Sequence, residues 1–224
     1  WDFQVVDNTS GEALYSMDGS TFNSGTANSS RNLHAVSGWM GSSYDENNRV
    51  AAPFAILDSV YKVVAKILAV DAAAQFPALN LNWSVINVKV DGDVTAGEIT
   101  TSHYNGTQIY LLGSQNSDTE EYDEHVIVHE WGHYFEDKFS RSDSVGGLHG
   151  LTDQLDMRVA FSEGFGNAFS AMMLDDPVYK DSDSVQQANL FSFDIDNNTC
   201  GPTEGWFNEC SVQSLLYDLY DSPG

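Results

Sequence analysis

The apolar residues of the chain follow two patterns, one typical of strands and one typical of helices. From Trp1 to Tyr15 apolar and polar positions partly alternate, which indicates short strands. From Pro53 to Phe76 the apolar residues instead recur three and four positions apart, and Pro53 suits a first helical turn. Because Pro77 would end such a segment, the pattern predicts a core helix over residues 53–76.

The remaining predicted elements place strands early in the chain and helices late. Strands are predicted at 33–36, 83–90 and 107–112. Helices are predicted at 122–139, 158–174 and 212–220. A stretch rich in Ser, Asn and Gly at 16–48 and a second at 144–150 are expected to be loops. This order favours an α+β fold over a doubly wound sheet, with a mixed N-terminal sheet and a mainly helical C-terminal part.

Length and charge narrow the classes of function. The 224 residues fit one domain, with or without a small second lobe. Nine basic against 33 acidic residues leave a net charge of −24, so a nucleic-acid partner is excluded and an anionic membrane surface is disfavoured. Charged residues interrupt the apolar stretch 50–81, so we expect no membrane insertion.

The predicted helix at 122–139 contains a His-Glu-x-x-His motif. His129 and His133 are one turn apart on one helix face, so both imidazoles can reach one metal ion. Glu130 beside them can act as the general base toward a metal-activated water. The apolar residues before the motif and the aromatic residues after it indicate a buried helix. The alternative is two structural histidines with a glutamate in a salt bridge.

The next predicted helix offers the missing ligand. Position 139 is Phe139 rather than a third histidine, so the extended metzincin motif is absent. Glu163 lies 30 residues after His133, which leaves room for a loop and an antiparallel return. Asn167 follows one turn later and would face the same helix.

On these motifs, at 126–135 and 161–168, the chain resembles gluzincin zinc metallopeptidases of the thermolysin-like and fungalysin-like kind. The resemblance extends more weakly over 50–220 and implies a zincin-like catalytic domain at 51–224, after an N-terminal β and loop segment at 1–50. It implies that His129, His133 and Glu163 bind zinc and that Glu130 is the catalytic base. Asn167 would orient His129, although these families usually carry aspartate there.

The same families use a histidine or tyrosine to stabilise the oxyanion. Tyr217 is the candidate here, with residues beyond Gly224 as an alternative if the chain is truncated there. His149, in the glycine-rich loop, is expected on the surface, but it could approach the substrate or replace Glu163 as a ligand. The segment 105–112 is similar to the edge strand that holds an extended substrate; an ordinary sheet strand is the alternative.

Two further features bear on compartment and cofactors. Cys200 and Cys210 favour a local disulfide and an oxidising compartment, that is, secretion, the cell surface or the periplasm; two free thiols are the alternative. The oxygen-rich run of Asp194, Asp196, Asn197 and Asn198 is a possible calcium site, although it lacks the glycine and glutamate of an EF-hand. The acidic run 118–124 is expected to be a solvated face.

Together these observations predict a zinc-dependent endopeptidase that hydrolyses polypeptides, with Glu130 as general base. The alternative is a zinc-stabilised binding or structural module that keeps the zincin fold without turnover. Departures such as Asn167 and the unassigned oxyanion donor motivate that alternative.

Overall fold

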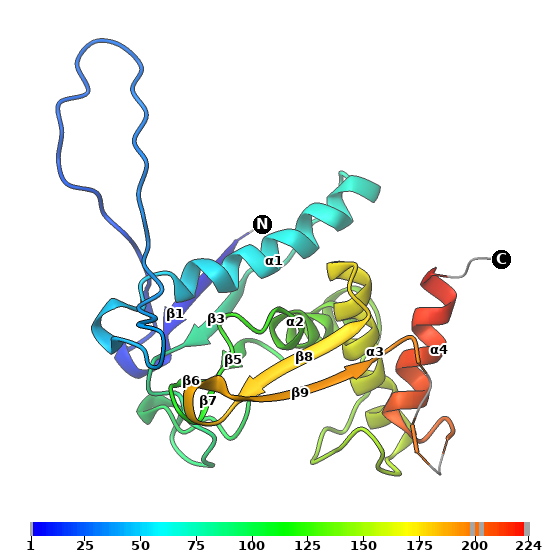
Figure 1. The fold of residues 1–224 in the computed structure, drawn as a ribbon. Coiled ribbons are helices and arrows are strands. Elements are labelled where there is room, and N and C mark those ends of the chain that lie inside the picture. Colours follow the sequence, from blue (N-terminus) through cyan, green and yellow to red (C-terminus); the bar gives the residue numbers. More distant parts are fainter. Residues whose placement is uncertain (1, 198–199, 202–203, 222–224) are drawn as a thin grey trace.

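The computed structural model describes residues 2–197, 200–201 and 204–221, which form two sheets flanked by long helices (Figure 1). The described strands are β1 (Phe3–Asp7), β2 (Ala13–Leu14), β3 (Leu79–Trp83), β4 (His103–Tyr104), β5 (Ile109–Leu111), β6 (Gly113–Ser114), β7 (Asp118–Thr119), β8 (Val178–Asp183) and β9 (Asn189–Asp194). The α-helices are α1 (Ala52–Val70), α2 (Glu124–Phe139), α3 (Met157–Leu174) and α4 (Glu209–Asp221). Short 3-10 turns occur at Asn8–Ser10, Glu46–Asn48, Val94–Ala96 and Val185–Gln187. The α+β fold class is confirmed.

The first sheet is mixed, with strand order β2-β1-β3-β5-β4. Its three central strands are parallel, and Val5, Leu81 and Ile109 lie side by side across them. The outer strands β2 and β4 run antiparallel to their neighbours. Strand β5 is therefore internal, because β4 occupies the edge, so of the two alternatives for 105–112 the ordinary sheet strand is the one that the structure supports.

The second sheet is antiparallel, with order β6-β7-β8-β9. Its long β8–β9 hairpin runs beside α2 and toward α3 (Figure 1). We did not predict this hairpin, because charged and hydroxyl side chains replace the expected apolar alternation in Lys180–Asp183.

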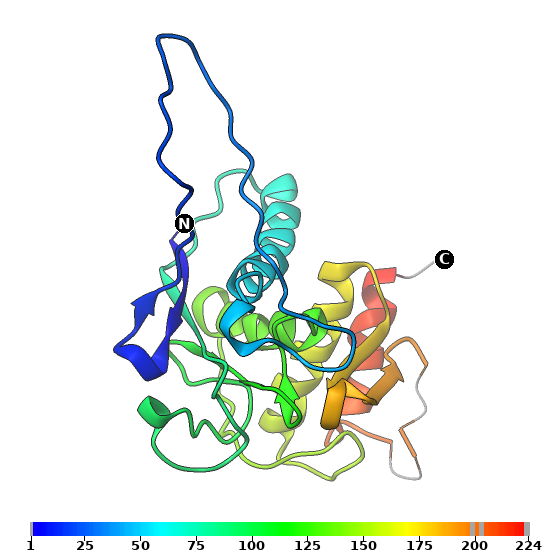
Figure 2. The ribbon, with the colours of Figure 1, turned by 60° about the vertical axis from the view of Figure 1, so that its left-hand side comes forward.

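Two predicted boundaries are wrong for identifiable reasons. Helix α1 ends at Val70 instead of reaching Phe76, because Asp71 is extended and its carboxylate accepts a hydrogen bond from the Ala73 N–H. The strand expected at 83–90 is instead β3, which ends at Trp83, and a turn closed by Asn87 N–H to Ser84 O follows. The strand expected at 33–36 is absent, and the surrounding segment extends from the body as a long loop (Figures 1 and 2).

The main core lies between the first sheet, α1 and α2. Ile56, Val60 and Val64 of α1 pack with Leu81, Ile109 and the α2 residues Ile127 and Trp131, all 1% exposed or less. Helix α3 lies between α2 and α4 in both views (Figures 1 and 2). This packing fixes α2 on one side against the sheet and on the other against α3. No described helix is long and apolar enough to cross a membrane.

Candidate metal centre

Two neighbouring helices bring three ligand atoms to one point. His129 and His133 project from α2, and Glu163 projects from α3. The two Nε2 atoms are 3.0 Å apart, and they lie 3.2 and 3.3 Å from Glu163 Oε2. His129 and Glu163 are 7% and 8% exposed, so water does not solvate this group freely.

The outer nitrogen of each imidazole has its own partner. His129 Nδ1 lies 2.8 Å from Asn167 Oδ1, and the Asn167 amide donates to Gln213 Oε1 of α4 at 2.8 Å. With the Asn167 amide donating to Gln213, the Asn167 oxygen faces the histidine, and in this arrangement His129 Nδ1 carries the proton and donates. The lone pair of His129 is thereby left at Nε2, the atom that points at Glu163.

His133 is oriented in the same way by a different partner. Its Nδ1 lies 3.2 Å from Ser162 Oγ, and Ser162 donates its own proton to Glu136 Oε2 at 2.7 Å. Ser162 must therefore accept from His133 Nδ1, which leaves the second lone pair at His133 Nε2. Two lone pairs and a carboxylate thus converge.

This donor set fits zinc. Ligands at 2.0–2.1 Å in a tetrahedron lie about 3.3–3.4 Å from one another, close to the separations between His129, His133 and Glu163. The ionisation of the group shows how strongly the carboxylate and the histidines attract one another when a proton, in place of a metal ion, lies between them. Burial lowers the pKa of His133, but the hydrogen bond and charge of Glu163 outweigh this and raise it to about 9. Burial also opposes the charge of Glu163, yet both histidines hold its pKa far below the usual range.

Glycines allow the helices to approach closely enough. A Cβ at Gly166 would lie 2.8–3.0 Å from three atoms of the His129 ring, and one at Gly132 would meet the Gly166 backbone at 3.3 Å. A Cβ at Gly164 would lie 2.7 Å from the Glu209 carbonyl oxygen of α4. The three positions therefore set the spacing of α2, α3 and α4.

Glu130 is held by the edge strand of the first sheet. Its Oε2 accepts a 2.8 Å hydrogen bond from the Tyr104 N–H of β4. Among the described residues no hydrogen bond occupies its Oε1. Glu130 is 8% exposed and lies on α2 next to the ligand His129. The edge strand therefore fixes the carboxylate that the motif predicts as the base.

His149 reaches the centre from its glycine-rich loop, as one of the alternatives left open by the sequence allowed. Its Nε2 lies 3.3 Å from Glu163 Oε2, and its Nδ1 lies 2.9 Å from Oε2 of the buried Glu209. The expectation of a surface histidine is confirmed, since His149 is exposed, but its imidazole also reaches the ligand group. The partner Glu209 lies 60 residues further along the chain, at the start of α4, so no local pattern links the two.

Tyr217 lies elsewhere, in a second apolar cluster with Val126, Ala171, Tyr179 and Ile195. It is 7% exposed, and among the described residues no hydrogen bond joins its hydroxyl to the histidines. Its proposed catalytic role stays a prediction.

The acidic run 118–124 is largely buried, which corrects the expectation of a solvated face. Asp118, Glu120 and Glu121 are 5%, 3% and 0% exposed. Glu121 pairs with Arg49, which also donates to the Gly113 carbonyl. The run thus connects the second sheet to the start of α2 from inside the protein.

The oxygen-rich run near residue 196 is exposed. Asp194 accepts a hydrogen bond from the Asp196 N–H, and the Asp196 carboxylate lies near Asp218 and Asp221 of α4. Asn198 lies outside the described residues. The predicted disulfide between Cys200 and Cys210 is present and joins this segment to α4.

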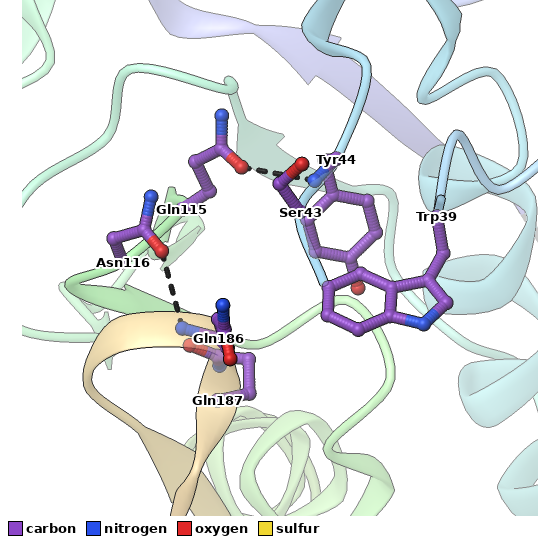
Figure 3. Close-up of a pocket in the computed structure, with 7 residues that line it drawn as sticks. All are labelled: Trp39, Ser43, Tyr44, Gln115, Asn116, Gln186 and Gln187. Carbon is purple, nitrogen blue, oxygen red and sulfur yellow. Dashed lines mark hydrogen bonds between the residues drawn. The ribbon is translucent and has the colours of Figure 1, made fainter. Parts of the chain in front are cut away.

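A small pocket lies where the segment around Trp39 and Tyr44 meets two loops (Figure 3). Gln115 accepts a hydrogen bond from the Tyr44 N–H, and Asn116 accepts one from the Gln186 N–H. No histidine or carboxylate lines it, so it offers no acid–base or metal chemistry (Figure 3).

The fold, the two-helix donor set and the adjacent glutamate are those of a gluzincin metallopeptidase domain. Comparison of the sequence with protein families agrees: residues 77–224, which are 148 of the 224 residues, match the Mycolysin C-terminal domain. The chain therefore belongs to the mycolysin family of metallopeptidases. No curated protein matches it.

Proposed function

We propose that the protein is a zinc-dependent endopeptidase that hydrolyses peptide bonds of polypeptide substrates. The observation that carries the proposal is the convergence of the His129, His133 and Glu163 ligand atoms within 4.8 Å, with Glu130 held beside them. A bound zinc ion would supply Lewis-acid chemistry, polarising the scissile carbonyl and making a water molecule more acidic.

Three side chains of the protein, those of Glu130, Asn167 and Ser162, have the other roles in the proposed reaction. Glu130, anchored through Oε2 by the Tyr104 N–H, takes the proton of the attacking water on Oε1 and returns it to the leaving amine. Asn167 and Ser162 keep the histidine lone pairs directed at the metal. Family membership supports this assignment, because the match over residues 77–224 includes every one of these residues.

His149 is the oxyanion donor that the geometry favours over Tyr217. Its imidazole lies at the edge of the ligand group, partly exposed, and the buried Glu209 anchors its Nδ1 at 2.9 Å. A histidine held in this way can donate from Nε2 to a substrate oxygen that becomes negatively charged. Tyr217 by contrast packs in an apolar cluster.

The disulfide supports an extracellular or periplasmic site of action, because such bonds persist in oxidising compartments. The net charge of −24 suits solubility in such a medium and excludes a nucleic-acid substrate.

The decisive experiment is Glu130→Gln with zinc content and cleavage of casein measured on the same preparation. We expect zinc to be retained and kcat to fall by about 10²–10⁴-fold, the usual contribution of a general base. Glu124→Gln is the matched control, since Glu124 is on the same helix but its side chain is 43% exposed and pairs with Lys62.

Unchanged cleavage by the Glu130→Gln variant would refute the proposed mechanism. A wild type that binds stoichiometric zinc and gains thermal stability from it, yet cleaves neither casein nor a peptide library, would instead favour the non-catalytic zincin module.

A further inference from the structure

Three carboxylates outside the histidine centre meet near the start of α2. Asp118 lies in β7, Glu120 lies between β7 and α2, and Asp181 lies in β8. One oxygen from each lies within 4.8 Å of the other two. Strands β7 and β8 are neighbours in the second sheet, which lies beside α2 (Figure 1).

Two of the three carboxylates are buried, Asp181 is half-buried, and one oxygen of each lacks a partner. Glu120 and Asp118 are 3% and 5% exposed. Asp118 Oδ1, Glu120 Oε2 and Asp181 Oδ1 are buried atoms without a hydrogen-bond partner among the described residues. A buried, unpaired carboxylate oxygen costs free energy, and three close together also repel one another.

Two neighbouring aspartates, Asp123 and Asp183, are not among the residues with a buried, unpartnered oxygen. Asp123 accepts hydrogen bonds from the Ser182 N–H at 3.0 Å and the Ser182 hydroxyl at 2.8 Å. Asp183 accepts from Ser184 and Asn189. Glu121 Oε2 also lacks a partner, but Glu121 forms a close ion pair with Arg49. Within this acidic region, unsatisfied oxygens that no close ion pair offsets are therefore found at the cluster.

The basic side chains nearby do not neutralise the cluster. Lys89 Nζ lies 3.9 Å from Asp118 Oδ2, and the Lys89 side chain is 60% exposed. Arg49 is bound to Glu121. Burial accordingly raises the pKa of Asp118 to about 7, and it also raises the pKa values of Glu120 and Asp181.

We propose that Asp118, Glu120 and Asp181 bind a calcium ion. Calcium takes six to eight oxygen ligands in flexible geometry, and this cluster supplies only oxygens. Three protein carboxylates suit calcium better than magnesium, which usually keeps several waters and takes one or two carboxylates. Water molecules would complete the coordination. The ion would tie β7 and β8 to the beginning of the helix that carries Glu130.

The test measures thermal unfolding of the zinc-loaded protein in calcium-free buffer and at rising CaCl₂, with zinc content checked in each sample. We expect a saturable rise of roughly 5–10 °C in Tm at a hundredfold excess of calcium over its Kd. MgCl₂ should give a smaller shift. Terbium, with luminescence excited through Tyr179 on the same face of β8 as Asp181, provides a second readout.

Glu120→Gln should abolish the calcium shift and the terbium signal. Without calcium this variant should be at least as stable as the wild type, because one of three repelling charges is gone. If it fails to fold, Asp118→Asn provides the same comparison. Asp183→Asn is the matched control: it removes a nearby, half-buried charge whose Oδ1 accepts two hydrogen bonds, and it should keep the full shift.

A wild type without a saturable calcium shift, or a Glu120→Gln variant that responds like the wild type, would overturn the proposal. Neither readout requires peptide hydrolysis, so both remain decisive if the protein proves not to cleave peptides.

Discussion

Helix α2 connects two groups of ionisable side chains that differ in how completely they are paired. In the histidine centre, Asn167 and Ser162 bind the outer nitrogens of His129 and His133, and further partners fix Asn167 and Ser162. In the carboxylate cluster at the start of the helix, one oxygen of each member has no partner.

The difference indicates what holds each group in place. The orientation of the histidines is built into the protein by hydrogen bonds to α3, so the centre is organised for its metal in advance. The carboxylates are brought together by the β7–β8 pairing and the chain leading into α2, and their mutual repulsion is relieved when they take up protons or, as proposed, a cation. We therefore expect removal of metal to disturb the cluster more than the centre.

The largest effect should come from Glu163→Ala. Loss of one of three protein ligands from a buried site should remove stoichiometric zinc and reduce peptide cleavage to background. Plasma mass spectrometry of the wild type and the variant in one preparation measures the metal. If the variant retains zinc, another residue must be the third ligand, and His149 is the nearest candidate because its Nε2 lies 3.3 Å from Glu163 Oε2.

His149→Ala should have the next largest effect. Removing one oxyanion donor typically lowers kcat by about 10²–10³-fold, and KM and zinc content should change much less. The kcat of Glu209→Gln should lie between those of His149→Ala and the wild type, because this change weakens the hydrogen bond to His149 Nδ1 and leaves the imidazole in place. An unchanged kcat for His149→Ala would exclude the assigned role, and loss of zinc would show that His149 acts through Glu163.

Asn167→Ala tests the outer hydrogen bonds of the centre directly. Partners of this kind usually contribute about 10–100-fold to metal affinity, so a competition titration with a zinc chelator should show a loss of that size. Asn167→Asp should retain affinity: aspartate also accepts from His129, and Gln213 can turn its unpartnered Nε2 toward it. Equal affinity of wild type and Asn167→Ala would contradict the assigned role.

The smallest effect concerns His125, a buried histidine one turn before His129. Burial lowers its pKa to about 4. The unfolded chain therefore binds more protons between pH 4 and 6.5, so stability falls as the pH falls through this range. From pH about 7.5 to about 5.5 the loss should be about 1 kcal/mol.

Urea unfolding of the wild type and His125→Gln at both pH values measures this difference. The variant should lose about 1 kcal/mol less than the wild type, while the exposed-histidine control His34→Gln should behave like the wild type. Identical pH dependence of wild type and His125→Gln would rule out the contribution of His125.

The sequence predicts the parts of the site that depend on local spacing. His129, Glu130 and His133 lie within one helix, and Glu163 and Asn167 lie one turn apart in the next, so helical periodicity alone puts each set on one face. The ordering of strands before helices likewise sufficed for the fold class.

Contacts between distant segments could not be predicted in the same way. His149 meets Glu209 across 60 residues, and Asp181 meets Glu120 through strand β8, which lacks apolar alternation over residues 180–183. The run 118–124 looks solvated because its composition is acidic. Only the packing of β7 against β8 shows that some of these acids face inward.

The close approach at Gly166 has a consequence for redesign of the protein. Because main-chain packing of α2 against α3 brings His129 within reach of Glu163, the spacing of the ligand atoms is a property of two backbones rather than of three side chains. An engineer who wished to fit a larger ion would leave the histidines alone and widen the helix pair. The choice of residue at positions 132 and 166 would then set the distance between the two helices, and with it the radius of the ion that the site accepts.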